Sequence, residues 1–152
     1  MQTFLKFWIS LFLISFSTMV YAQGGICEEA IEITEGTIQS DGPILASGAY
    51  NECWSLGENA IWYVYYPIQS GLATVDASGF LGNRVKVYSG SCDSLVCETV
   101  DGGSSWTAVV TFEVPQGEPY YIEWDDRWRI NEFDFALSMQ KFDDCPMIPY
   151  YP

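Results

Sequence analysis

Hydrophobic and polar residues alternate with a period of two through most of the chain. In the segment from Thr107 to Val114, for example, Ala108, Val110, Phe112 and Val114 share one face. The same alternation recurs in segments 72–77, 84–88, 120–124 and 133–137, with glycine, proline, asparagine and aspartate clusters between them. No segment sustains a helical period. This pattern is typical of antiparallel strands that place one face on a core, and it predicts an all-β protein.

One segment departs from the alternation. From Ala60 to Tyr66 β-branched and aromatic residues occupy both faces, which predicts a central strand covered on both sides or at an interface. Pro67 then ends the strand. Short strands are also predicted at 30–33 and, more weakly, at 43–49. About eight strands in roughly 120 residues is the size of a β-sandwich.

The two ends of the chain differ in character from the segments between them. Lys6 precedes an apolar run from Phe7 to Phe16, and small residues lead to Ala22, as in a secretory signal peptide cleaved after that residue. An uncleaved membrane anchor is the alternative. Three prolines in the last ten residues predict an extended tail. We therefore predict a signal peptide at 1–22, a β-sandwich domain at 23–142 and a proline-rich tail at 143–152.

Charge and the absence of histidine exclude several classes of function. Without the signal, the chain has 5 basic and 20 acidic residues, a net charge of −15, which disfavours nucleic acid and anionic membranes as partners. The chain has no histidine, so Ser-His-Asp and Cys-His catalysis and histidine-bearing zinc sites are excluded. Glycosidase chemistry, which needs only two carboxylates, remains as an alternative. We expect a protein that is not an enzyme.

Two of the few basic residues lie in one predicted strand. Arg84 and Lys86 alternate with Val85 and Val87, so they are expected to face away from the core. We expect neighbouring carboxylates to neutralise them.

Five cysteines in an exported chain predict two disulfides and one free thiol. Cys92 and Cys97 enclose four residues and form one natural pair, and Cys27 and Cys53 form the next. Cys145 in the tail is then unpaired, and it is a candidate for a disulfide-linked dimer. The sequence leaves other pairings open, including Cys27 with Cys145.

An acidic segment is a candidate metal site. Carboxylate and amide oxygens are the ligands that Ca²⁺ prefers, and they could come from Asp125, Asp126, Asn131, Glu132 and Asp134. The spacing matches no EF-hand loop, however, and Arg127 and Arg129 lie among the acids, so internal ion pairing is the alternative. Calcium is the only cofactor that the sequence suggests.

Tryptophans in predicted loops are candidate ligand-binding residues. A flat aromatic ring can pack on the apolar face of a sugar, and Trp54, Trp106 and Trp128 lie in such loops. The alternative is that these rings lie at the edge of the core.

Several motifs in order resemble a known family. They are Cys27-x-x-Ala30-Ile31-x-Ile33, Trp62-Tyr63-x-Tyr65, Val85-x-Val87-Tyr88-Ser89-Gly90-Ser91-Cys92 with Leu95 and Cys97, Val114-Pro115-x-Gly117-x-Pro119-Tyr120-Tyr121-Ile122, and Phe133-Asp134-Phe135-x-Leu137. Over residues 26 to 144 the chain resembles bacterial pre-peptidase C-terminal domains, in particular the cysteine-bearing versions common in exported Bacteroidetes proteins. The resemblance implies a jelly-roll-like β-sandwich and a non-catalytic module.

These features together predict a secreted or cell-surface protein, with the periplasm as the alternative compartment. We expect a binding or adhesion module for a glycan or an extracellular protein, with or without calcium. The alternative is an assembly or accessory subunit that binds another protein through the tail, Cys145 or a sheet edge.

Overall fold

A computed structural model describes residues 23–42, 49–50, 53–54, 57–103, 107–128 and 131–142. The predicted signal peptide, the tail with Cys145, the loop residue Trp106 and most of the predicted strand at 43–49 lie outside the described residues. In the described ranges, no helix is both long and apolar enough to cross a bilayer.

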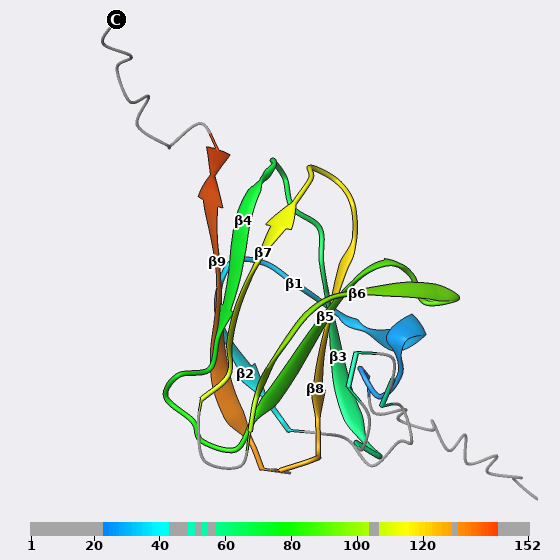
Figure 1. Ribbon diagram of the computed structural model, residues 1–152, viewed down its shortest axis with the longest axis vertical. Coiled ribbons are helices and arrows are strands. Elements are labelled where there is room, and N and C mark those ends of the chain that lie inside the picture. Colours follow the sequence, from blue (N-terminus) through cyan, green and yellow to red (C-terminus); the bar gives the residue numbers. More distant parts are fainter. Residues whose placement is uncertain are drawn as a thin grey trace, which may run out of the picture.

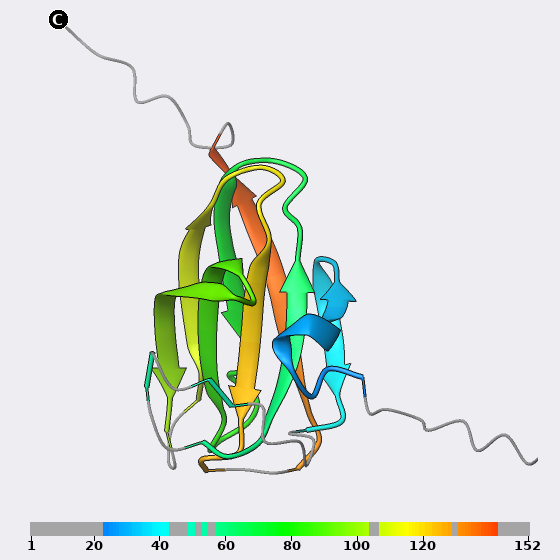
Figure 2. The same ribbon diagram turned by 90° about the vertical axis from the view of Figure 1, so that its right-hand side faces the viewer.

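Two sheets pack face to face, as Figures 1 and 2 show. The five-stranded sheet has the order β1 (Ile31–Ile33), β3 (Ala60–Tyr65), β8 (Tyr120–Asp125), β5 (Arg84–Ser91), β6 (Ser94–Gly102). The four-stranded sheet has the order β2 (Gly36–Ser40), β9 (Phe133–Lys141), β4 (Gly71–Asp76), β7 (Val109–Val114). Among the described strands, only β1 and β3 pair in parallel. The predicted all-β, mainly antiparallel sandwich is confirmed.

Two of the nine described strands were not predicted. In β2 only Ser40 is fully buried, and in β6 only Leu95 and Gly102 are. Both are edge strands, so each pairs with a neighbour on one side only. Their buried and exposed side chains show little alternation along the strand. The segment between Cys92 and Cys97, which we suggested as a disulfide pair, contains the start of β6. Ser91 pairs with Ser94 there across a two-residue turn.

The space between the sheets is filled by apolar side chains. Ile122 and Trp124 of β8 lie there with Phe133 and Phe135 of β9, and the Trp124 ring contacts both phenylalanines at centroid distances of 4.8 and 5.2 Å. The strands predicted from alternation contribute their predicted inner faces to this core, including Val110, Phe112 and Val114.

The outer face of the five-stranded sheet is also covered, as expected for β3. All six residues of β3 are buried. Ala60 and Trp62 belong to a second cluster with Tyr88, Leu95 and Cys27, and residues from the segments before β1 and before β3 pack against it. The short 3-10 helix η1 (Cys27–Glu29) contributes to this cover beside β3 (Figure 2).

Two disulfides attach these covering segments to the β5–β6 hairpin. Cys27 pairs with Cys92, and Cys53 pairs with Cys97. The same four cysteines were predicted to form disulfides, but the suggested pairs Cys92–Cys97 and Cys27–Cys53 were wrong. Cys92 lies in the hairpin turn while Cys97 lies along β6 opposite Tyr88, so each meets a different covering segment.

Candidate functional site

Four charged side chains lie buried on the outer face of the five-stranded sheet. Arg84 and Lys86 of β5 face Glu123 and Asp125 of β8, and these four residues are called the charge cluster below. Arg84 Nε donates to the two carboxylate oxygens of Asp125 at 2.9 and 2.8 Å, and Arg84 Nη2 pairs with the same group. Lys86 Nζ lies 2.9 Å from Glu123 Oε1 and 3.0 Å from Asp125 Oδ2. The predicted neutralisation of Arg84 and Lys86 is confirmed, although both are buried rather than solvated.

Tyr50 connects the segment before β3 to this cluster. Its carbonyl oxygen accepts from Lys86 Nζ at 2.7 Å and from the Tyr88 hydroxyl at 3.2 Å, and its amide donates to Glu123 Oε1 at 3.2 Å. Its ring meets the Tyr88 ring edge to face at 5.5 Å. The cluster therefore holds this covering segment on the sheet.

Two cations and two carboxylates balance the charge of the cluster, but burial still affects its titration. Burial raises the pKa of Glu123 from 4.5 to about 7, although Lys86 and the hydrogen bond from the Tyr88 hydroxyl (2.8 Å) act in the opposite direction. Burial and the nearby Glu123 carboxyl raise the pKa of Tyr88. Neither group is reachable from solvent, so the cluster has the character of a structural support.

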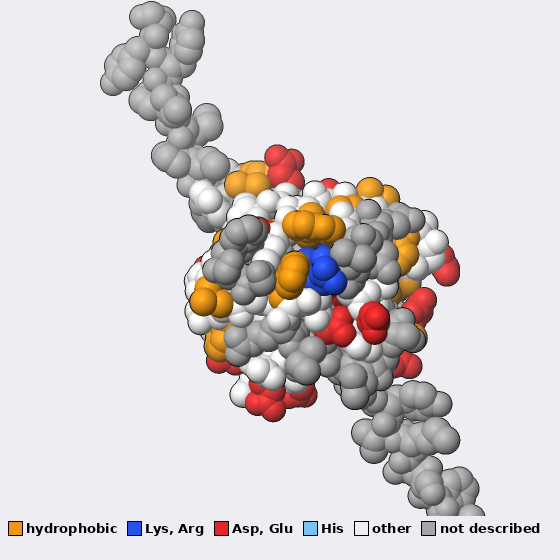
Figure 3. Space-filling model, turned by 60° about the horizontal axis from the view of Figure 1, so that its bottom comes forward, with side chains coloured by type: hydrophobic (Ala, Val, Ile, Leu, Met, Phe, Trp, Pro, Cys, Tyr) orange, Lys and Arg blue, Asp and Glu red, His pale blue; other side chains and the backbone are white. Residues whose placement is uncertain are grey.

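Two half-exposed tryptophans rest on arginine side chains. The Arg84 guanidinium lies 5.7 Å from the centre of the Trp54 ring, and Arg127 lies 4.7 Å from that of Trp128. The Arg127 amide in turn donates to Asp125 Oδ1 at 3.0 Å. Trp54 is 49% exposed and Trp128 47%. Trp54 precedes β3 and Trp128 follows β8, and the two strands pair at Ala60 and Asp125. We call this end of the sandwich the loop end, and Figure 3 shows hydrophobic side chains beside a basic group there.

The structure thus connects two of the three predicted ligand-binding tryptophans through Asp125. Trp106, the third, lies outside the described residues. No local pattern in the sequence shows this connection, because it depends on Arg84, which is distant from both tryptophans along the chain.

The five residues predicted to bind calcium have separate roles. Asp125 is occupied by Arg84 and Lys86. Asp126 accepts from the Glu58 amide at 2.9 Å and from Asn59 Nδ2 at 2.6 Å, and these bonds lower its pKa even though burial acts to raise it. Asn131 and Glu132 are exposed, and Asp134 lies on the four-stranded sheet opposite Gln39. Among the described residues, no three Asp, Glu, Cys or His side chains are grouped as metal ligands.

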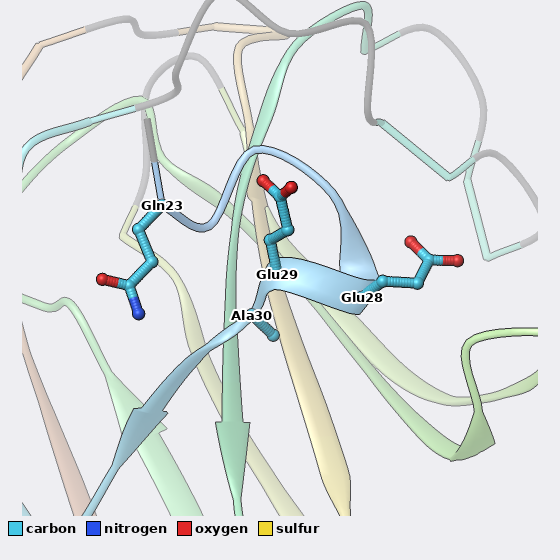
Figure 4. Close-up of a pocket in the computed structure, with 4 residues that line it drawn as sticks. All are labelled: Gln23, Glu28, Glu29 and Ala30. Atoms are coloured by element: carbon cyan, nitrogen blue, oxygen red, sulfur yellow. The ribbon is translucent and has the colours of Figure 1, made fainter. Parts of the chain in front are cut away.

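Three hollows lie around β1, the first two on the outer face of the five-stranded sheet and the third beside Tyr65, which belongs to the core between the sheets. The first, of about 440 Å³, lies beside Gln23, Glu28, Glu29 and Ala30, and Figure 4 shows Glu28 and Glu29 projecting from η1. The second, of about 240 Å³, shares Glu28 and Ala30 with the first. The third, of about 260 Å³, shares Tyr66 with the second. We call the three together the β1 groove. No pattern in the sequence indicated it.

Comparisons with known proteins give a limited result. No family model matches the sequence, and no curated protein matches it. Eight solved chains match the structure. One is the pre-peptidase C-terminal domain of a collagenase from Bacillus anthracis, at a TM-score of 0.45 and 11% sequence identity, covering 72% of this chain and 95% of that one. That domain is of the class that the sequence motifs resemble. At this TM-score the likeness carries no argument, so the fold assignment rests on the two sheets themselves.

Proposed function

We propose that this chain is an exported, non-catalytic β-sandwich module that binds a glycan through Trp54 and Trp128. One observation carries the proposal: both rings are half-exposed and each rests on a guanidinium, and the two arginines meet at the same buried Asp125, Arg84 through its side chain and Arg127 through its backbone amide. Two disulfides in the described residues support export, because such bonds persist in oxidising compartments.

The chemistry of this loop end suits a sugar. An indole face packs on the apolar face of a pyranose, and polar groups beside it hydrogen-bond the hydroxyls. Arg127 supplies such a group beside the Trp128 ring, and Arg84 lies beside the Trp54 ring. A ring that is already stacked on a guanidinium loses little freedom on binding, which favours affinity. Calcium has no part in this proposal, because Asp125 is already paired with cations.

Binding to immobilised polysaccharides tests the proposal. For a polysaccharide that the wild-type protein binds, we expect Trp54→Ala and Trp128→Ala each to weaken binding about two- to tenfold, the range for loss of one aromatic contact. Ile68→Ala is the matched control, because Ile68 is 76% exposed in the connection between β3 and β4 and should have no effect. Failure of the wild type to bind any glycan on a broad array, or equal losses in all three variants, would contradict the proposal.

Export is tested separately by intact mass under non-reducing conditions. We expect a chain cut after Ala22 that contains two disulfides. A mass that retains residues 1–22 would contradict the signal peptide.

A further inference from the structure

The β1 groove differs from the loop end in both shape and charge. The floor of its second hollow is one row of residues across the sheet, in which Glu32 of β1 is paired with Val64 of β3 and Val64 with Tyr121 of β8. Residues of η1 and Cys92 of the β5–β6 turn border it on one side. Tyr66, which is 47% exposed, separates the second hollow from the third.

The lining of the groove is acidic and aromatic. Glu28, Glu29, Glu32 and Glu35 line its three hollows, together with Tyr66, Tyr121 and the largely buried Tyr65, whose hydroxyl donates to Glu35 at 3.1 Å. None of the described residues that line it is basic. Burial, and then the nearby Tyr66 and Glu28, raise the pKa of the Tyr121 hydroxyl. The groove therefore complements a cation that also offers apolar surface to an aromatic ring.

The position of the groove along β1 defines the shape of its occupant. β1 is the edge strand of its sheet, and among the described strands it pairs only with β3. The hollows follow the chain from Glu28, past Glu32, to Glu35. An extended segment along this edge would present alternate side chains to the groove, as strands added to sheet edges do.

We propose that the β1 groove binds an extended, lysine- or arginine-bearing segment of a partner protein, with its basic side chains directed at Glu28 and Glu32 and an aliphatic stem on Tyr66. Lysine and arginine fit both the acidic and the aromatic residues of this lining, because their stems are apolar and their ends are charged. This surface is separate from the loop end with Trp54 and Trp128, so either proposal can fail without the other.

A synthetic peptide of alternating lysine and threonine is the probe, and fluorescence anisotropy and amide chemical shifts are the readouts. We expect binding that weakens with salt, and shifts at Glu32, Val64 and Tyr66. The double variant Glu28→Gln/Glu32→Gln should weaken binding about fivefold and reduce its salt dependence. Tyr66→Ala should weaken binding by a similar factor while leaving the salt dependence unchanged.

Matched controls separate this surface from the general negative charge of the protein. Glu113→Gln removes an exposed carboxylate from β7 in the other sheet and should leave binding unchanged. A peptide with glutamate in place of lysine should not bind. The proposal is overturned if Glu113→Gln weakens binding as much as the groove variant, if shifts map to the loop end, or if the glutamate peptide binds equally well.

Discussion

The two faces of the five-stranded sheet are built differently, although they share the same strands. On the inner face Val85 and Ile122 belong to the apolar core between the sheets. Lys86 follows Val85 along the chain and Glu123 follows Ile122, so both point to the outer face. There they form a buried ion pair beneath a covering segment. The inner face is held by a second sheet, and the outer face by two disulfides and one charge cluster.

The two faces contribute differently to the free energy of folding and to the position of the covering segments. Apolar packing tolerates many arrangements of similar volume, whereas a buried ion pair with tyrosine and backbone partners stabilises one geometry and penalises others. We infer that the inner face provides much of the free energy of folding. The outer face determines where the segments that carry Trp54 and Cys27 lie.

Lys86→Met should produce the largest effect. Without this cation, Arg84 is the one remaining cation of the charge cluster beside the buried carboxylates of Glu123 and Asp125. We expect a loss of about 3–5 kcal/mol in the free energy of unfolding. Urea denaturation at neutral pH measures it. Lys141→Met, at the exposed end of β9, is the control and should change stability by less than about 0.5 kcal/mol. Equal effects of the two variants would mean that the charge cluster does not support the outer face.

Removal of one disulfide should have a somewhat smaller effect that is confined to the outer face. For Cys27→Ala/Cys92→Ala we expect a loss of about 2–4 kcal/mol, because the bridge closes a long loop in the unfolded chain. The Trp62 amide, which donates to the Gly24 carbonyl at 2.7 Å, should then exchange its hydrogen faster. The Ile122 amide serves as the comparison. An equal increase for both amides would show that the two faces unfold together.

The pH dependence of stability should come from the outer face. The pKa of Glu123 is raised by burial from 4.5 to about 7, so between these values the folded protein holds a proton that the unfolded chain has released. Stability should therefore be highest below pH 4.5 with respect to this group, and should fall by about 1–3 kcal/mol as pH rises through about 7. Glu123→Gln should remove this slope in urea denaturation series. A slope that persists in this variant would assign it to another group.

The inner-face substitution Ile122→Val should produce the smallest of these effects. It removes one methyl group from the apolar core and should cost about 0.5–1.5 kcal/mol. Its pH profile should run parallel to that of the wild-type protein, because no charge is disturbed. Val96→Ala, at a 58% exposed position on β6, is the control and should have little effect. A steeper pH profile in Ile122→Val would mean that the two faces are coupled.

Strands could be predicted from the sequence where apolar and polar side chains alternate, and they were missed where they do not. The strand at Val109–Val114 was predicted because its inner residues form an apolar row. The strand at Ser94–Gly102 was missed because it is an exposed edge strand, held by backbone pairing to β5. The candidate site shows the same limit. Trp54 and Trp128 were identified as candidate ligand-binding residues, but their connection through Asp125 was not. Asp125 was a candidate calcium ligand, and in the structure it is paired with Arg84 and Lys86.

The amino-acid sequence alone predicted the all-β class and the apolar rows of the core, and it favoured the four cysteines that form disulfides over Cys145. Those properties follow from residue type and from spacing over a few positions. Which cysteines pair, the burial of Arg84 and Lys86, and the groove beside β1 all depend on the tertiary structure. The contacts that produce them join residues far apart along the chain. Tyr50 and Glu123, whose hydrogen bond holds the covering segment on the sheet, are separated by 73 positions, and no local periodicity records such a contact.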